Sequence, residues 1–260
     1  MNAKSRFVWH DLNTKNAEAA KRFYGELFNW TFEKSENSPY AHIKAGEEMI
    51  GGIRQMDANE RTPPSWLGYV GVDDVAASVA TITKNGGKVY MPTTTMEKVG
   101  TFAVIADPTG GVFAPWKSAR PGEDREPTGK PGMHTFCWDE LTTNDVEKAA
   151  RFYEAAFGWA VEKVDMGAMG TYTLLKRTGV KDEKGADKNA GGVMNIPPNA
   201  PYPPFWLSYV AVPDAAATAE KAKRLGGSVM AGPMDIPNVG KFAVLLDTEK
   251  AAFGVLQAST

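Results

Sequence analysis

The chain has 260 residues, of which 43% are hydrophobic and 23% are charged, and its formal net charge is -2. This balance excludes the strongly basic surface that nucleic-acid binding requires. No apolar run reaches the roughly 18 residues that span a bilayer, and the polar start Met1–Arg6 predicts no signal peptide. A single cysteine, Cys137, excludes an internal disulfide and a multi-cysteine metal site. We therefore expect a cytoplasmic monomer or homodimer without nucleic-acid or membrane partners.

The sequence is internally duplicated. Phe7–Trp30 (FVWHDLNTKNAEAAKRFYGELFNW) matches Phe136–Trp159 (FCWDELTTNDVEKAARFYEAAFGW) without a gap, and 11 of the 24 positions are identical. A second block, Trp66–Phe113, matches Trp206–Phe253, so the copies extend over 7–117 and 136–257. The stretch between them is rich in Pro, Gly and charge, as linkers are. The predicted divisions are a first domain at 1–117, a linker at 118–132 and a second domain at 133–260.

In chain order, the two-residue period of Phe7–Asn13 predicts a strand. Behind Asn16, a plausible N-cap, apolar side chains at helical spacing predict a helix. Gly51-Gly52, and Gly191-Gly192 in the second copy, indicate a strand bend or bulge. The other elements expected in the first copy are strands at 30–34, 40–44, 49–56 and 67–72, a helix at 74–85, and strands at 88–91, 101–106 and 112–116. Each copy thus contains a βαβββ module twice, and the chain contains it four times.

Three motifs accompany this plan. Both copies carry W-x-[DE]-L, at Trp9–Leu12 and Trp138–Leu141, and both carry RFY, at Arg22–Tyr24 and Arg151–Tyr153. The first copy ends with DPTGGVFAPW at Asp107–Trp116. The chain in these respects resembles the vicinal-oxygen-chelate superfamily of glyoxalase I, bleomycin-resistance proteins and extradiol dioxygenases, and within it bacterial proteins with tandem glyoxalase domains. The resemblance implies an α+β fold whose four modules form two half-open cups of mixed sheet, with helices outside and a small-molecule ligand inside.

The resemblance also implies where a divalent metal would be held, on the first and last strands of paired modules. None of the residues at these positions can ligate a metal, so we predict no metal and no other cofactor, with a divalent metal as the alternative. A register slip of one residue would bring His10 or Asp139 to the first-strand position. The three histidines are interpreted as surface or rim residues. The implied ligand positions are Trp9, Leu67 and Ala114 in the first copy and Trp138, Leu207 and Gly254 in the second.

Two acidic residues, Asp11 and Glu140, are the candidate catalytic groups, because each follows the motif tryptophan by two residues and shares its face of the strand. A carboxylate in an aromatic cavity can act as an acid or base, or can bind an amine or hydroxyl. The alternative is a structural bond to backbone or to a cation. The candidate ligand-binding residues are Trp9, Asn13, Tyr40 and Trp66 in the first copy and Trp138, Thr142, Tyr172 and Trp206 in the second; core packing is the alternative for the aromatic ones.

Four functions remain open from the sequence. The first is a metal-free protein that binds a small organic molecule. The second is a lyase, isomerase or hydroxylase-like enzyme that uses Asp11 or Glu140. The third is a metal-dependent glyoxalase or dioxygenase, and the fourth is a regulatory protein with vestigial cups. Fold resemblance alone does not choose among them, since one fold supports many functions.

Overall fold

The computed structural model describes residues 5–35, 38–120, 131–167 and 170–259. Within these ranges each copy contains two βαβββ modules, as predicted. The first copy consists of β1 (Phe7–Thr14), α1 (Ala17–Phe28), β2 (Thr31–Lys34), β3 (Ala41–Ala45), β4 (Glu48–Gln55), β5 (Ser65–Gly71), α2 (Val75–Lys84), β6 (Lys88–Met96), β7 (Gly100–Ala106) and β8 (Val112–Ser118). Most of the predicted linker lies outside the described residues.

The second copy repeats the order of elements. It consists of β9 (Phe136–Thr143), α3 (Val146–Phe157), β10 (Trp159–Asp165), β11 (Thr171–Lys181), β12 (Asp187–Asn195), β13 (Phe205–Ala211), α4 (Ala215–Arg224), β14 (Ser228–Ile236), β15 (Gly240–Leu246) and β16 (Ala252–Ala258). The second copy has a polar insertion at residues 177–190 that the first copy lacks, and the long strands β11 and β12 carry it as an extension of their hairpin.

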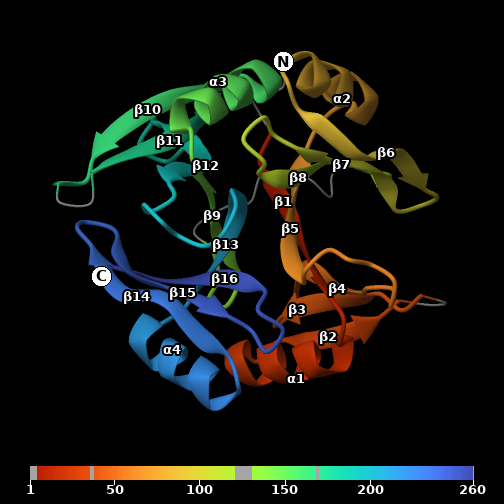
Figure 1. Cartoon of the computed structure of the whole chain (residues 1–260), viewed down its shortest axis with the longest axis vertical. Coiled ribbons are helices and arrows are strands. Elements are labelled where there is room, and N and C mark those ends of the chain that lie inside the picture. Colours follow the sequence, from red (N-terminus) through yellow and green to blue (C-terminus); the bar gives the residue numbers. More distant parts are fainter. Residues whose placement is uncertain (1–4, 36–37, 121–130, 168–169, 260) are drawn as a thin grey trace. The chain divides into compact units, whose positions relative to one another are not determined.

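Each copy contributes one eight-stranded sheet, in the order β2-β3-β4-β1-β5-β8-β7-β6 and β10-β11-β12-β9-β13-β16-β15-β14 (Figure 1). β1 and β4 are parallel, as are β5 and β8, whereas the pairs β2–β3, β3–β4, β6–β7 and β7–β8 are antiparallel. The order does not close on itself, so the sheets are open and mixed. The predicted α+β fold of four βαβββ modules is confirmed.

The chain forms two compact units, and each combines one module of each copy. The first, here named the α2/α3 unit, contains those helices with β6–β8 and β10–β12. The second, the α1/α4 unit, contains those helices with β2–β4, most of β1, and β14–β16. Each unit has its own apolar core, in which side chains of both copies meet.

The first helix of each copy begins and ends as its sequence dictates. Asn16 accepts a hydrogen bond from the Ala19 amide at 3.0 Å, and Asp145 accepts one from the Lys148 amide at 2.9 Å, which are N-cap bonds. Gly158 ends α3 in the left-handed conformation, with φ of 72°. The buried side chains of α1 keep the helical spacing of the prediction: Ala17, Ala20, Phe23, Tyr24, Leu27 and Phe28.

Among the elements predicted in the first copy, β6 differs most in length from its prediction. β6 extends to Met96, five residues beyond the predicted end at Met91, and passes through Pro92. A proline lacks the amide hydrogen that a central strand needs, so the expected strand stopped before it. β6 is the last strand of its sheet, where one edge forms no ladder and a proline is tolerated.

Candidate functional site

In the α1/α4 unit, the Asp11 carboxylate lies in a cluster of aromatic donors. The Tyr40 hydroxyl donates to Asp11 Oδ1 at 2.7 Å, and the Trp9 indole nitrogen donates to the same oxygen at 2.9 Å. The indole nitrogen also lies 3.0 Å from the Tyr40 hydroxyl. The structure thus brings together three of the predicted site residues. Two of the partners of Asp11 are thus aromatic side chains that the sequence also placed at the site.

A glycine makes this cluster possible. Asp11 pairs with Gly52 across the parallel strands β1 and β4. A Cβ atom added to Gly52 would lie 1.9 Å from the Tyr40 hydroxyl oxygen and 2.7 Å from Asp11 Oδ1. The tyrosine therefore reaches the carboxylate through space that only glycine leaves open.

The predicted bulge at the glycine pair is confirmed in both copies. Ile43 pairs with Gly51 but Lys44 pairs with Met49, so that one residue of β4 is extra. β11 and β12 show the same shift between Leu175 and Lys176. A bulge re-aims the side chains that follow it.

Burial governs the ionisation of Tyr40. Desolvation raises the pKa of its hydroxyl far above the usual value, and the charge of Asp11 and the hydrogen bond to it raise the pKa further. The tyrosine consequently remains a neutral hydrogen-bond donor at physiological pH. Only 8% of Asp11 is exposed, so this donor holds a nearly buried carboxylate.

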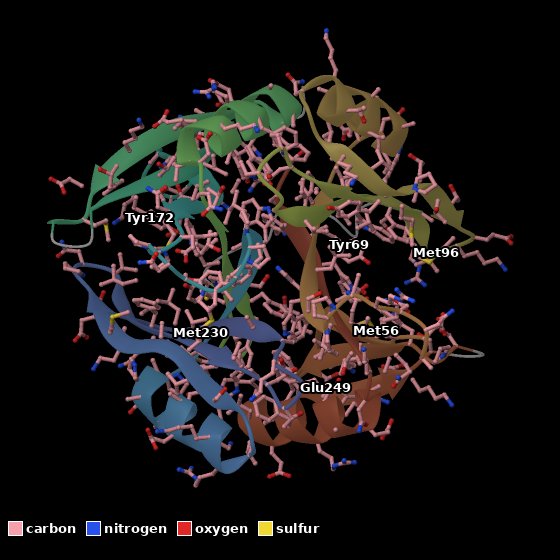
Figure 2. The ribbon with its side chains drawn as sticks, viewed as in Figure 1. Met56, Tyr69, Met96, Tyr172, Met230 and Glu249 are labelled. Carbon is pink, nitrogen blue, oxygen red and sulfur yellow. The ribbon has the colours of Figure 1, made fainter. Side chains whose placement is uncertain are left out.

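The α2/α3 unit contains the second version of the pair. The Tyr172 hydroxyl, labelled in Figure 2, donates to Glu140 Oε2 at 2.7 Å. A Cβ atom on Gly192 would lie 2.0 Å from that hydroxyl. Tyr202 also lies near Glu140: burial, and secondarily the charge of Glu140, raise the pKa of its hydroxyl. The sequence did not predict Tyr202, because the loop that carries it has no matching tyrosine in the first copy.

The next position along each first strand is also polar. Asn13 Oδ1 accepts a hydrogen bond from Arg54 Nε at 2.6 Å. The two terminal nitrogens of the same guanidinium donate to the two oxygens of the Glu60 carboxylate, each at 2.8 Å. Thr142, the counterpart of Asn13, donates to the Phe205 carbonyl at 3.4 Å. Arg54 and Glu60 were not predicted, since they have no counterparts of similar chemistry in the second copy.

Two of the predicted ligand-binding tryptophans lie in the cores instead of beside the carboxylates. Trp66 is 8% exposed and donates to the Tyr24 hydroxyl at 3.0 Å, and Trp206 is 4% exposed and donates to the Tyr153 hydroxyl at 2.8 Å. This is the packing role weighed as the alternative. Trp138, the counterpart of Trp9, is half-buried on β9.

An aromatic group that sequence reasoning missed lies on the α2/α3 unit. Tyr69 of β5 contacts Phe102 and Trp116 with ring centroids 6.1 and 5.9 Å away. On the same three strands, Val70, Ala103 and Phe113 pack in the core between the sheet and the helices. Each ring lies an odd number of residues from one of these side chains, so by strand alternation the three rings occupy the opposite face of the sheet. Trp116 belongs to the quoted DPTGGVFAPW motif, which was the available signal.

The repeated βαβββ modules of the chain match a known protein superfamily. The model of the Glyoxalase/Bleomycin resistance protein/Dioxygenase superfamily matches residues 6–114 and 133–254. The chain belongs to this superfamily. It is 37% identical over 255 residues to CFP32 of Mycobacterium tuberculosis, which carries a provisional name as a glyoxylase, and the match covers 96% of this chain and 93% of the relative. It is 30% identical over 266 residues to the anthracycline biosynthesis protein DnrV of Streptomyces peucetius, covering 96% and 92%.

Solved structures show the same superfamily fold at low sequence identity. The Mn(II)-bound glyoxalase of Novosphingobium aromaticivorans superposes with a TM-score of 0.63 at 15% identity, covering 97% of this chain and 83% of that one. The 2,3-dioxygenase LapB of a Pseudomonas species superposes with a TM-score of 0.66 at 11% identity, covering 98% and 92%. The likeness establishes the architecture and leaves the reaction open.

The superfamily's metal does not fit the residues present. Within the described ranges, no three His, Cys, Asp or Glu side chains gather where they could hold an ion. His10, which a register slip would have offered as a ligand, is 5% exposed and stacks on Phe136 with centroids 4.0 Å apart. The interpretation of His10 as a surface or rim residue was wrong, because this ring is enclosed by an aromatic neighbour. His42 lies edge-on to Tyr40, 5.2 Å between centroids.

None of the helices in the described part of the chain has the length and apolar character required to cross a membrane.

Proposed function

We propose that the protein binds a small aromatic molecule bearing a hydroxyl or amine, and that it does so without the superfamily's metal. The observation that carries this proposal is the carboxylate–tyrosine pair, Asp11 with Tyr40 and Glu140 with Tyr172, at 2.7 Å in each copy. A nearly buried carboxylate accepts strong, charge-assisted hydrogen bonds and recognises a ligand donor. Two glycines at matching positions keep the space for both pairs.

Aromatic chemistry of the ligand has separate support. The group Tyr69, Phe102 and Trp116 presents rings on the sheet face opposite the helices of the α2/α3 unit. Ring faces and edges of this kind suit flat apolar ligands. DnrV, at 30% identity, takes its name from anthracycline biosynthesis, which produces hydroxylated polycyclic aromatics. Hydroxyanthraquinones are therefore the first ligand class to test.

The second candidate is an enzyme that uses Asp11 or Glu140 as a general acid or base. It is favoured by the short bond between Asp11 and the neutral Tyr40, an arrangement that places a proton next to a base. The alternatives differ in what Asp11→Asn changes. In a binding protein, Asp11→Asn weakens the affinity for the ligand. In an enzyme, the same substitution abolishes turnover of a ligand that still binds.

The proposal is tested by metal analysis and ligand-dependent stabilisation. Protein purified without a metal-affinity tag is analysed for nickel, zinc, iron and manganese, then titrated with hydroxyanthraquinones in a thermal-shift assay. A ligand specific to the folded state stabilises by about 2.7 kcal/mol at one hundred times its Kd. We expect saturable stabilisation in the metal-free protein, reduced in Asp11→Asn and Glu140→Gln. Near-stoichiometric metal that is needed for binding would replace the proposal with a metal-dependent glyoxalase or dioxygenase.

A further inference from the structure

The two carboxylate–tyrosine sites differ at one position that faces both of them. Arg54 follows Gly52 by two residues on β4. Met194 follows Gly192 by the same spacing on β12. A Cβ atom on either glycine would point at the tyrosine hydroxyl of its site, so by strand alternation Arg54 and Met194 lie on the same face as that hydroxyl. The same position therefore offers a cation in the α1/α4 unit and a thioether in the α2/α3 unit.

Arg54 is held in a fixed orientation beside Asp11. It pairs with Asn13 across β1 and β4, and its Nε donates to Asn13 Oδ1 at 2.6 Å. Its terminal nitrogens hold the Glu60 carboxylate at 2.8 Å. The hydrogen bond from Arg54 lowers the pKa of Glu60 to about 2, so the carboxylate stays ionised and the pair persists at neutral pH. The guanidinium is fixed on two sides, while 40% of the Arg54 side chain is exposed.

Arg54 adds a hydrogen-bond donor at a set distance from the Asp11 carboxylate. Asp11 and Asn13 are two residues apart on β1, which separates their backbones by roughly 7 Å. Glu60 balances the charge of Arg54, and Asp11 adds a negative charge nearby, so a neutral acceptor suits this end of the site better than a second carboxylate. A flat molecule with a hydroxyl at one end and a ketone at the other matches both groups.

The same end of the α2/α3 site has lost this polar group. The segments from Gly52 to Trp66 and from Gly192 to Trp206 are equally long, which makes Ala200 the counterpart of Glu60. Met194 is half-buried and offers an adaptable apolar contact, and its sulfur donates no hydrogen bond. Thr142, in the place of Asn13, directs its hydroxyl to the Phe205 carbonyl at 3.4 Å. An apolar group of a ligand is therefore favoured beside Met194.

We propose that the two sites select different ligands and that Arg54 determines the difference. The α1/α4 site takes a hydroxylated aromatic ketone, whose hydroxyl donates to Asp11 and whose carbonyl accepts from Arg54. The α2/α3 site takes a hydroxylated aromatic molecule whose far end is apolar and lies against Met194. Both preferences rest on the proposed function of the carboxylate–tyrosine pairs and name the ligand class of each.

Two phenols of nearly equal shape separate these preferences. In para-isopropylphenol, a methyl group takes the place of the ketone oxygen of para-hydroxyacetophenone. Each is titrated into the whole protein below neutral pH, where both are uncharged, and the amide chemical shifts of Gly52 and Gly192 report on the two sites. We expect the ketone to bind roughly fivefold to tenfold more tightly than the isopropyl compound at Gly52, as one hydrogen bond from a partly exposed cation contributes. At Gly192 the isopropyl compound should bind more tightly.

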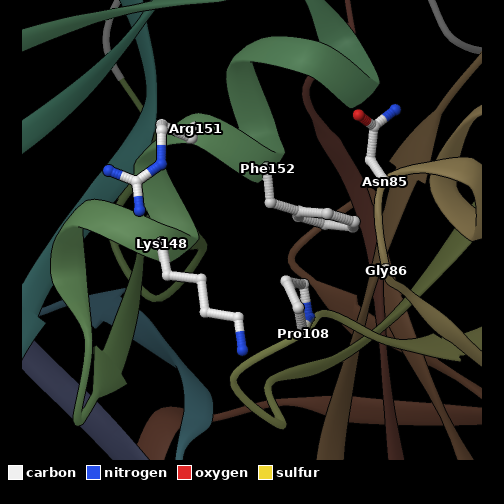
Figure 3. A pocket seen from close by; sticks show the side chains of 6 residues that line it. All are labelled: Asn85, Gly86, Pro108, Lys148, Arg151 and Phe152. Atoms are coloured by element: carbon white, nitrogen blue, oxygen red, sulfur yellow. The ribbon is translucent and has the colours of Figure 1, made fainter.

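Gly86 is the control reporter. It lines a separate pocket of about 360 Å³ at the end of α2, together with Lys148 and Arg151 of α3 (Figure 3). This pocket shares no residue with either carboxylate–tyrosine site, and its two cations favour an anion over an uncharged phenol. A shift of Gly86 that follows those of Gly52 and Gly192 at the same concentrations would mark nonspecific binding and overturn the assignment.

Exchange of the differing side chains gives matched variants. Arg54→Met with Glu60→Ala gives the α1/α4 site the side chains of the other, and should remove its preference for the ketone. Met194→Arg with Ala200→Glu is the reciprocal exchange, and should create that preference in the α2/α3 site. Because each variant changes one site, the unaltered response of the other shows that the protein is folded.

Failure of this assignment and failure of the proposed function give different results. Equal preferences at Gly52 and Gly192 would overturn the role of Arg54 and leave ligand binding intact. A preference for the ketone at Gly52 that survives Arg54→Met with Glu60→Ala would do the same. The absence of a saturable shift at either glycine with either phenol would overturn both.

Discussion

Gly52 and Gly192 act at the candidate site without bearing a functional group. Each lies beneath a tyrosine hydroxyl that reaches a carboxylate on the neighbouring strand, and an added Cβ atom would lie 1.9 or 2.0 Å from that hydroxyl. Glycine usually weakens a strand, because it adds backbone entropy and no packing. Its presence at the same position of both copies is explained by the pairs Asp11–Tyr40 and Glu140–Tyr172, and this leads to a direct substitution test.

Gly52→Ala should displace the Tyr40 hydroxyl and separate it from Asp11. Forcing a methyl group into filled space destabilises a fold by about 1–3 kcal/mol. Urea unfolding measures this loss, and the ligand titration of the proposed function should show weaker binding. Gly132→Ala is the matched control, because its Cβ atom would meet only the Thr135 side chain, at 3.4 Å. A Gly52→Ala protein as stable as the control would refute this explanation of the glycine.

The Arg54–Glu60 pair predicts how stability depends on pH. The hydrogen bond from Arg54, followed by that of the Asp57 amide, lowers the pKa of Glu60 to about 2 from the ordinary 4.5. A carboxylate whose pKa is lowered by folding stabilises the protein above the unfolded value and loses that contribution as pH falls through the folded value. The contribution of Glu60 is therefore present above pH 4.5 and disappears near pH 2.

Glu60→Gln is expected to remove this contribution. Because both side chains of the pair remain partly exposed, Arg54 at 40% and Glu60 at 27%, the loss should stay below about 1 kcal/mol. Urea unfolding of both proteins at several pH values from 6 to 2 should show curves that converge toward pH 2. Glu47→Gln is the control, since Glu47 is fully exposed beside Lys44 and should not change stability. A difference between Glu60→Gln and wild type that is constant with pH would contradict the assignment.

At the scale of elements, the RFY and DPTG motifs are explained by two buried hydrogen-bond chains. In the α2/α3 unit, Trp206 donates to the Tyr153 hydroxyl at 2.8 Å, which donates to Asp107 Oδ2 at 2.8 Å. The α1/α4 unit repeats the chain with Trp66, Tyr24 and Asp247. In each chain the tyrosine comes from one copy and the aspartate from the other, so the motifs fix helix to turn across copies.

Tyr153→Phe should destabilise the protein by about 1–3 kcal/mol, because it leaves a buried indole donor and a buried carboxylate without their shared partner. Tyr24→Phe should have a similar effect. Tyr90→Phe is the control, since this ring on β6 is 57% exposed, and its change should stay within about 0.5 kcal/mol. Equilibrium urea unfolding is the measurement. An effect of Tyr153→Phe no larger than that of the control would show that the chain contributes nothing to stability.

The sequence predicted the elements well and the site in part. Helical spacing behind Asn16 and strand alternation around Asp11 are local signals, and both are confirmed. Tyr40 was named as an aromatic near the ligand, but its bond to Asp11 depends on the register of β1 against β4 and on the absent Cβ of Gly52. Trp66 was assigned to the ligand because its position after a proline pair does not reveal which face it occupies. Pairings set by sheet register and by the fold of distant segments leave no local pattern.

At the scale of the whole molecule, the division into two sheets coincides with the two sequence copies, whereas the division into two compact units does not. Each sheet contains the strands of one copy, whereas each unit contains one module of each. In the α1/α4 unit, Tyr24 packs against Phe253 with centroids 5.3 Å apart. In the α2/α3 unit, Phe113 packs against Phe157 at 5.8 Å. Both cores are thus completed only when both copies are present.

The copies should therefore fold together rather than separately. Fragments 1–120 and 131–260, divided in the predicted linker, each lack half of both cores and would expose the apolar faces of two helices to water. We expect each fragment alone to be unfolded or self-associated, and an equimolar mixture to recover a cooperative thermal transition measured by circular dichroism. Size-exclusion chromatography with light scattering identifies the species. A single fragment that remains a monomer and unfolds cooperatively, as the full chain does, would show that one copy completes its own core.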